Sequence, residues 1–516
     1  MKRNLLFIIA LFACVLSFAQ GELDAYRYSN SDLSGTARGQ AMGGAFGALG
    51  GDVTGVAINP AGIGVYRSSE VLVNMSLSSP FTGGKSFQQS NTKFSFDNLS
   101  YIVYYPLVNG SMLSLNFGFN YNRIKSYNQL IGVSGPDIQS SLTDYMELLT
   151  NGVDHNLWLN GIDYMYDHTN VGFLSILAFD GGLINPILGT GDQYRTILDD
   201  GEKVRPRLNA SEKGKVENYD FTIGSNIADK LYWGATITIT DLSYLMSSAY
   251  KEDFLGEEGG GFDLVNDLET KGSGFQMKAG TIYKPTDVLR FGLAYHSPVW
   301  YTMTDYYSAA LTPHGIYDLG SGKALGRTET PYEYYNYQLR TPWSWTASVA
   351  AVLGAQAIVS IDYENKNYGD MILKDERGYD FRNDNEYIRE DYKNASTVRA
   401  GFEYKFTPQY SVRLGYAFSQ NPYKKSMKNM GIDAVTSGSA PHYTIDGDVN
   451  YMTIGIGYRF TPQFYVDCAL VHRSQNNDLY YFPPVDTSGS GLDSFQGKGS
   501  YTNQSLKGLL TLGYKF

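Results

Sequence analysis

The end of the chain, residues 505–516, shows the clearest alternation of apolar and polar positions. One parity holds Leu506, Gly508, Leu510, Leu512, Tyr514 and Phe516, and the other holds Ser505, Lys507, Thr511 and Lys515. A period of two predicts a β-strand with one apolar and one polar face. A strand of a soluble sandwich alternates in the same way. The aromatic last residue favours the closing strand of an outer-membrane β-barrel, apolar towards lipid and polar towards the lumen.

The same period of two recurs along the chain and predicts fourteen strands, an even number. They are residues 69–78, 98–106, 111–124, 216–226, 230–245, 272–284, 288–301, 333–353, 357–367, 394–406, 410–421, 448–460, 463–475 and 501–516. Short connections alternate with long polar ones. Short periplasmic turns and long outer loops are typical of outer-membrane barrels, whereas a soluble sandwich has no reason to segregate its loops by length. The pattern therefore predicts an all-β membrane barrel of about 14 antiparallel strands.

Charged residues on the polar faces of these strands are candidates for the lumen. Arg290, Arg399 and Arg413 each share a parity with glycines, whereas the opposite faces are aliphatic and aromatic. Charges inside and apolar groups outside suit a barrel in lipid. The simplest interpretation is that these charges fill and stiffen the lumen, and the alternative is that they bind a ligand.

The N-terminus predicts export. Lys2 and Arg3 precede an apolar run from residue 5 to 18 that is too short to span a bilayer, and Ser17 and Ala19 suit cleavage after residue 19. Residues 1–19 are therefore predicted to be a signal peptide. A lipoprotein acylation box at residues 11–14 is the alternative, and either way the chain leaves the cytoplasm. With the barrel pattern, this places the protein in the outer membrane of a Gram-negative-type bacterium.

The composition of the chain excludes several classes of function and site. A formal charge of −11 leaves no electrostatic footprint for nucleic acid. The 43 Tyr and 56 Gly suit membrane interfaces, turns and crowded lumens. After cleavage Cys468 is the one remaining cysteine, so neither an intramolecular disulfide nor a cysteine zinc site can form. We expect no metal and no cofactor.

Residues 20–68 have no β pattern and are rich in small residues. A phosphate-binding loop is excluded because no strand precedes the glycines, no Lys-Ser/Thr follows them, and the protein is exported. Small residues suit a short helix packed in a confined space. A fourteen-stranded barrel leaves an open lumen unless something fills it. This segment is therefore predicted to be a helical hatch, followed by the barrel at residues 69–516.

The hatch carries a family resemblance. Its pattern G-T-A-R-x-x-A-M-G-G-A-F-x-A-L-x-x-D, followed by N-P-A-G, resembles the hatch of the FadL/TodX family of outer-membrane channels for long-chain fatty acids and other hydrophobic compounds. Residues 284–298 and 339–345 also resemble this family. The resemblance covers essentially the whole mature chain, and it implies a fourteen-stranded barrel with an N-terminal hatch.

The resemblance also implies positions for the ligand path. Asn59, Pro60 and Ala61 fall on the hatch motif, which in the family lies near a kinked wall strand where ligand is thought to leave sideways into the membrane. Gly118 is the candidate for the kink, because glycine interrupts pleat and packing. The mature N-terminus reaches a lumen pocket in the family, so Tyr26 and Tyr28 are expected to line it.

One long insertion, at about residues 125–215, departs from the family pattern. A structureless loop of that length is improbable, and residues 137–150 have a helical pattern. We expect an extracellular cap. It either offers an apolar landing surface for ligand or packs only on itself.

These features favour a channel for passive uptake of hydrophobic small molecules, fatty-acid-like or aromatic. The pocket would lie above the hatch and the exit in the wall, with outer-membrane lipid as neighbour and the chain as a monomer. The alternative is a FadL-like barrel that serves a secretion or surface-assembly system. A haem receptor using His155 and His168 is less favoured, because their spacing matches no ligand pattern. An enzyme is not expected, because the six histidines lie mostly in predicted loops without a G-x-S-x-G context.

Overall fold

The computed structural model describes residues 21–83, 92–108, 110–199, 201–257, 259–317, 324–425, 427, 439–485 and 497–516. The predicted signal peptide lies outside these residues. Among them, no helix is both long and apolar enough to cross a membrane.

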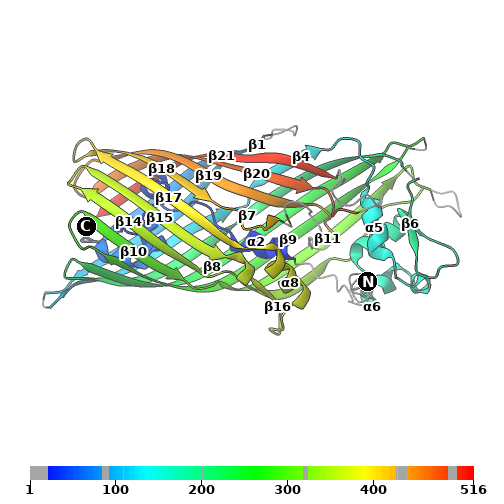
Figure 1. Cartoon of the computed structure of the whole chain (residues 1–516), viewed down its shortest axis with the longest axis horizontal. Helices are drawn as coiled ribbons and strands as arrows, with labels where there is room; N and C mark the ends of the chain where they lie inside the picture. Colours follow the sequence, from blue (N-terminus) through cyan, green and yellow to red (C-terminus); the bar gives the residue numbers. More distant parts are fainter. Residues whose placement is uncertain are drawn as a thin grey trace.

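The wall is a closed antiparallel barrel of fourteen strands, which confirms the predicted fold class (Figure 1). In order around the wall the strands are β1 (Glu70–Gly83), β2 (Lys93–Pro106), β3 (Met112–Ser126), β7 (Val204–Ile227), β8 (Leu231–Phe254), β9 (Gly261–Tyr283), β10 (Leu289–His296) with β11 (Trp300–His314), β13 (Glu333–Arg340) with β14 (Ser344–Leu353), β15 (Ala357–Asn367), β17 (Asn394–Lys405), β18 (Tyr410–Ser419), β19 (Tyr443–Arg459), β20 (Phe464–Tyr480) and β21 (Lys498–Lys515). Pairing of β21 with β1, from Glu70↔Lys515 to Gly83↔Thr502, closes the ring.

Two wall strands are broken at a proline. Residues 288–301 were predicted as one strand, but β10 and β11 are separated around Pro298, and β13 and β14 are likewise separated around Pro342. Proline has no N–H to donate to a ladder, which explains both interruptions. The smaller elements are β4 (Gln129–Ser134), β5 (Ile184–Pro186), β6 (Tyr194–Thr196), β12 (Thr328–Glu329), β16 (Ile372–Asp375), α2 (Glu22–Ser29), α3 (Ala37–Ala41), α4 (Val53–Ile58), η2 (Pro60–Val65), α5 (Leu142–Thr150), η3 (His155–Asn160), α6 (Ile162–His168), α7 (Phe173–Asp180), η4 (Tyr368–Asp370) and α8 (Arg382–Asp391).

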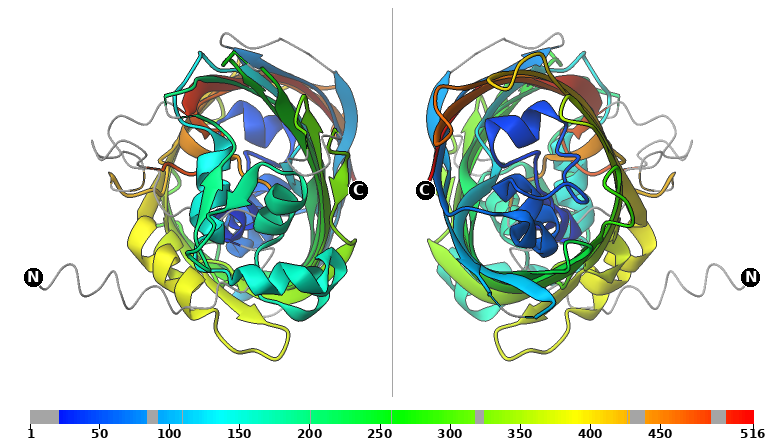
Figure 2. Two further views of the ribbon diagram at one scale, coloured as in Figure 1. Left: turned by 90° about the vertical axis from the view of Figure 1, so that its right-hand side faces the viewer. Right: turned by 90° about the vertical axis from the view of Figure 1, so that its left-hand side faces the viewer.

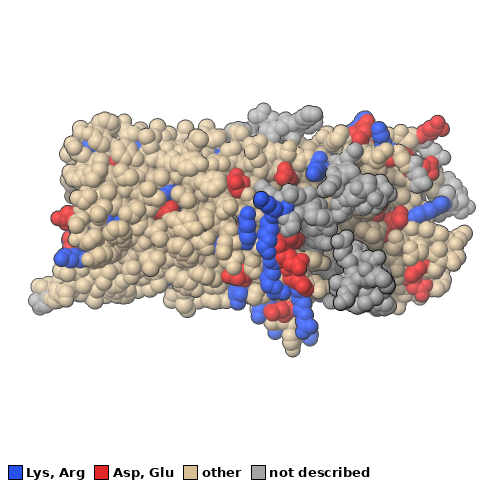
Figure 3. All heavy atoms as spheres, in the orientation of Figure 1, with Lys and Arg blue, Asp and Glu red and all other residues tan. Residues whose placement is uncertain are grey.

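An apolar belt surrounds the half of the barrel next to the short turns. Its exposed outward side chains include Phe221, Ile237, Ile239, Met277, Phe291, Leu293, Val349, Ile361, Phe402, Leu414, Ile454, Ile456 and Leu470. Tyr283, Phe406, Phe460 and Phe516 stand exposed at the short turns, as expected for an interfacial girdle. Figure 3 shows few charged side chains over this half and many over the other. The C-terminus lies at the end with the short turns (Figure 1).

The polarity of the wall reverses above the belt. Along β8, the outward residue after Ile237 and Ile239 is Asp241, while Leu242 and Tyr244 beyond it point inward and are buried. The outer halves of β7, β8 and β9 therefore enclose an apolar core, as a water-soluble barrel would. The sequence predicted that this strand begins at residue 216, but β7 begins at Val204. The reversal explains why the outer part of the strand was missed.

A cap of helices lies over the outer mouth. It comprises α5, η3, α6, α7, β5 and β6, between β4 and β7 (Figures 1 and 2). Its buried side chains join those of the outer barrel in one continuous core, including Ile138, Met146, Leu177, Leu208 and Phe262. Leu159 and Leu188 remain exposed at its surface.

One buried carboxyl group joins the cap to the barrel and should make the cap sensitive to pH. Glu252, at the outer end of β8 above the belt, accepts hydrogen bonds from Ser141 Oγ and from the backbone N–H of Leu142 at the start of α5. Burial, aided by nearby Asp144, raises the pKa of Glu252 from 4.5 to about 7. The folded state then binds this proton more tightly than the unfolded state. The stabilisation is complete below pH 4.5 and is lost as the pH rises through 7.

We therefore expect hydrogen exchange at the α5 amides, corrected for the intrinsic rate, to be faster at pH 8 than at pH 5.5. Glu252→Gln, which stays neutral, should reduce this difference, and the part that remains belongs to Asp144, whose pKa burial raises to about 6. Glu269→Gln, at an exposed carboxylate paired with Lys271, is the control and should retain the full difference. Equal pH dependence in all three proteins would contradict the role of Glu252.

Candidate functional site

The hatch, α2 to η2, lies inside the barrel, as the views along the axis show (Figure 2). Wall glycines allow its backbone to approach the wall closely. A Cβ added at Gly292 would lie 2.3 Å from the carbonyl oxygen of Gly47, and one at Gly234 would lie 2.2 Å from that of Pro60. Other wall glycines facing the hatch at similarly short range are Gly118, Gly224, Gly280, Gly401, Gly415 and Gly455. At this level the hatch meets the wall without room for an added methyl group.

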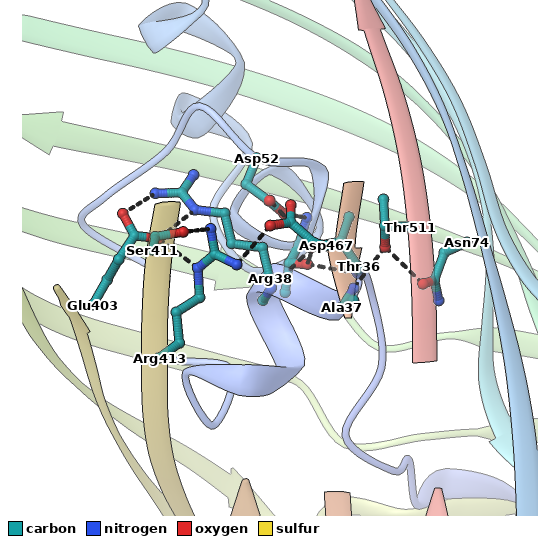
Figure 4. A network of polar contacts seen from close by, with 12 residues as sticks. Thr36, Ala37, Arg38, Asp52, Asn74, Glu403, Ser411, Arg413, Asp467 and Thr511 are labelled. Atoms are coloured by element: carbon teal, nitrogen blue, oxygen red, sulfur yellow. Dashed lines mark hydrogen bonds and ion pairs between the residues drawn. The ribbon is translucent and has the colours of Figure 1, made fainter. Parts of the chain in front are cut away.

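A charged network fixes the hatch in place (Figure 4). Arg38 of α3 donates from Nε to Glu403 at 2.9 Å, and Arg413 donates to Glu403 and to Asp467 at 2.6 Å each. The backbone N–H of Ala37 donates to Thr511 Oγ1 at 2.8 Å. Because these ion pairs are buried, removing one partner would leave an uncompensated charge.

The hatch motif packs against the wall strands β8 and β9. Asn59 Nδ2 donates to the carbonyl oxygens of Gly47 and Thr281, at 2.7 and 3.0 Å, and its Oδ1 accepts from the N–H of Ala61. Pro60 begins η2. The motif thus locks the fold of the hatch and joins it to the wall.

At Gly118, the predicted kink position, the pairing of the wall strands is regular. The pairing of β3 with β2 and β7 runs through Gly118 without a shift, and the shifts in its ladder with β7 lie near Ser114 and Lys125 instead. Gly118 makes room for Ile63 of η2, whose side chain would lie 2.9 Å from an added Cβ. The absence of a side chain at Gly118 therefore leaves space for Ile63.

Helix α2 stands in the lumen above the rest of the hatch. Tyr26 lies against the rings of Tyr368, Tyr392 and Tyr423, with centroid distances of 5.4, 5.8 and 5.2 Å. Tyr28 shares a hydrogen bond of 2.8 Å with Thr270 of β9. Both side chains are buried, and the helix with the segment after it separates two cavities.

The first, which we call the central cavity, has a volume of about 210 Å³ and is lined by both tyrosines. The charged side chains of its wall form ion pairs with one another. Lys278 pairs with Asp220 at 3.0 Å, Lys366 pairs with Glu364 at 3.4 Å, and Arg399 also pairs with Glu364. His296 Nε2 lies 2.9 Å from the carbonyl oxygen of Ile58. These contacts make the central cavity polar.

The second, which we call the side cavity, has a volume of about 190 Å³ and is lined by Tyr26 but not Tyr28. Its basic lining residues are Arg27, Lys93, Arg123, Lys125, Arg473 and Lys507, and its acidic ones are Asp32, Glu212 and Asp446. Lys125 and Arg473 lie 3.6 and 3.7 Å from Asp32, beyond hydrogen-bond distance, and the buried Nε of Arg473 has no acceptor among the described residues. Basic groups with spare donors are suited to an anionic head group.

The side cavity lies where the neighbouring wall strands β2 and β3 cease to pair. Strands β2 and β3 pair from Pro106↔Ser114 up to Asn98↔Asn122, and no rung joins them beyond that in the described residues. Above this point β2 pairs only with β1, and β3 only with β7. Ser95 and Arg123, which line the cavity, come from the two separated edges, and Arg123 reaches Asp97 across the gap at 2.5 Å.

The three arginines selected from the sequence all face the lumen, in different roles. Arg290 donates to the carbonyl oxygen of Leu49 at 2.7 Å, and Arg413 belongs to the hatch network. Only Arg399 lines the central cavity. Lys125 and Arg473 were missed. Arg473 shares the lumen parity of Asp467 on β20, which would have made it a candidate, but nothing in the sequence pairs it with β3.

No group of three or more His, Cys, Asp or Glu side chains in the described residues is placed to hold a metal ion. His155 and His168 lie on η3 and α6 of the cap, and His155 Nε2 is 3.0 Å from the carbonyl oxygen of Gln193.

Comparisons with known proteins agree with this architecture. The family model for "outer membrane protein transport protein (OMPP1/FadL/TodX)" matches residues 227–479. A "47 kDa outer membrane protein" of Pasteurella multocida is 22% identical over 228 residues, which is 42% of this chain and 47% of that protein. The crystal structure of a Pseudomonas aeruginosa FadL homologue has 14% identity and a TM-score of 0.52, covering 95% of this chain and all of the other. That of the Ralstonia pickettii toluene transporter TbuX has 14% identity and a TM-score of 0.49, covering 93% and 98%.

Proposed function

The chain belongs to the FadL/TodX family of outer-membrane transport proteins, and on that premise we propose that it is a passive, monomeric channel for amphipathic hydrophobic compounds. The substrate class has an acidic head group and an apolar tail, as a fatty acid does. We propose no catalytic role.

The observation that carries this proposal is the coincidence of the basic side cavity with the gap between β2 and β3. An anionic head group beside Lys125 and Arg473 would place its tail towards the gap. Phe94 and Phe96, on the outer face of β2 next to the gap, are 65% and 42% exposed and would meet both tail and lipid. The hatch supports sideways release, because its close contacts with the wall block the axial path.

The two lumen cavities supply the rest of the path. Ligand would pass under the cap, bind beside α2 with Tyr26 as an apolar contact, and leave between β2 and β3. Asn59, Pro60 and Ala61 hold the hatch closed during this passage, and Tyr28 anchors α2 to β9. Of the three predicted arginines, Arg399 is the one that would meet ligand in the central cavity.

Head-group recognition gives the direct test. Lys125→Gln with Arg473→Gln should weaken oleate binding at least tenfold, because a hydrogen bond to a charged group contributes about 1.5–3 kcal/mol. Binding of oleyl alcohol should stay within about twofold. Both can be measured by displacement of a fluorescent fatty acid from the purified protein. Lys271→Gln, at an exposed lysine far along β9, is the matched control. Equal loss of both ligands, or of neither, would contradict a carboxylate site in the side cavity.

A further inference from the structure

A second interruption lies on another side of the wall. β15 ends at Asn367, β17 begins at Asn394 and β18 ends at Ser419. The pairing of β18 with β19 stops at Ser419↔Val449, whereas that of β19 with β20 continues to Tyr443↔Tyr480. Above these three strand ends the regular ladders stop, and between β13 and β19 the described backbone is joined only by shorter contacts, among them an antiparallel bridge between Tyr392 and Tyr423. We call this region the window.

Residues 368–393, which we call the side cover, fill this window from outside. Within the cover, β16 pairs with β13 from Arg340↔Ile372 to Tyr337↔Asp375. Helix α8 lies outside the ring of strands (Figure 2). Phe381, Asn385, Ile388 and Tyr392 recur at helical spacing and are buried, while Arg382, Glu386, Arg389 and Glu390 are exposed. The cover is thus amphipathic, with its inner stripe over the window and a charged outer face (Figure 3).

The inner side of the cover reaches the lumen. Tyr392 Oη donates to the carbonyl oxygen of Glu22 in α2 at 3.2 Å. Tyr368, at the start of the cover, lines the central cavity together with Ala395 of β17. A helix inside the barrel therefore contacts a segment outside it, with no wall strand of the described residues between them.

The window lies at the level of lipid head groups. Tyr363 of β15 and Tyr416 of β18 point outward just below it, 38% and 42% exposed. Their hydroxyl groups bond Ser396 and Asn450, at 2.8 and 2.7 Å. Tyrosines with this arrangement mark a membrane–water interface. The charged outer face of α8 follows directly above them and suits contact with polar head groups.

We propose that the side cover is a movable panel through which amphiphiles of the outer leaflet reach the central cavity. It is held by four rungs with β13, by an antiparallel bridge between Tyr392 and Tyr423, and by its buried apolar side chains. Hydrogen bonds from Lys393 N to Pro422 O at 2.8 Å and from Lys424 Nζ to Arg389 O at 2.7 Å add to these contacts. This inference builds on the proposed function, because it gives the same lumen an opening to lipid distinct from the gap at β2 and β3.

Access from the lipid tests the inference without measuring transport. The chain with Cys468→Ser would carry a single cysteine at Ala395, beneath the cover, or at Asn218. Asn218 lines the same cavity on β7, where it pairs with both β3 and β8. Each protein is placed in vesicles that contain a phosphatidylethanolamine with a maleimide on its head group. We expect Ala395→Cys to be labelled at least tenfold faster than Asn218→Cys.

Loosening the cover should increase this difference. Ile388→Asp puts a carboxylate into the fully buried stripe and should raise labelling at Ala395→Cys a further tenfold, while Arg389→Asp, on the exposed face, should not. Heat-modifiable migration of the barrel on gels shows that each variant is folded. Labelling of Ala395→Cys no faster than that of Asn218→Cys would overturn the inference. Failure of the oleate test would instead overturn the proposed head-group site and leave the labelling result standing.

Discussion

Ser95→Trp should reduce uptake of a long-chain fatty acid at least tenfold in proteoliposomes. Ser95 lines the side cavity at the free edge of β2. An indole ring there would take up much of a cavity of about 190 Å³ and close the gap towards β3. The fold should survive, because the side chain is added to a cavity and not to a packed core.

Phe96→Trp is the matched control, since this neighbouring side chain points outward and is 42% exposed. It should leave uptake within about twofold of the parent, as expected of one lipid-facing aromatic residue replaced by another. Undiminished uptake by a folded Ser95→Trp protein would show that ligand does not pass through the side cavity.

Gly292→Leu should have the opposite effect and create a leak for small hydrophilic solutes. A Cβ at this position would lie 2.3 Å from the carbonyl oxygen of Gly47, closer than van der Waals contact allows. The wall strand is held by ladders on both sides, so the hatch must move. We expect the rate of arabinose permeation, measured by swelling of proteoliposomes, to rise at least tenfold.

Gly508→Leu is the control for this substitution, because a Cβ there meets nothing within 4 Å although the residue is also a wall glycine. It should not leak. If a folded Gly292→Leu protein remained impermeable to arabinose, close packing of the hatch would not be what closes the axial path.

The positions of the wall strands could be predicted from the sequence because the strands face lipid on one side. Outward side chains must be apolar and lumen side chains polar wherever a strand crosses the hydrocarbon, so alternation located all fourteen strands. The same rule failed above the membrane, where β7 to β9 bury their apolar residues inside. Alternation also did not show the breaks at Pro298 and Pro342, because it reports the polarity of side chains and not the backbone N–H that proline lacks.

The candidate site was predictable only in part. Parity predicted a lumen position for Arg290, Arg399 and Arg413, but parity does not tell which lumen residues contact the hatch and which line a cavity. Lys125 and Arg473 come together because β3 and β20 face the same cavity, which is a property of the closed barrel. For Gly118 the structure adds a contact that parity does not show, because the absence of a side chain leaves space for Ile63.

Hydrophobic ligand and hydrophilic solute would follow separate paths through this barrel, one sideways past the side cavity and one blocked by the hatch. Fatty-acid uptake and arabinose leak measured in the same vesicles test this directly. We expect the parent to take up fatty acid without leaking, Ser95→Trp to lose uptake alone, and Gly292→Leu to gain the leak while retaining uptake. Loss of both properties together, or uptake that rises in step with the leak, would contradict it.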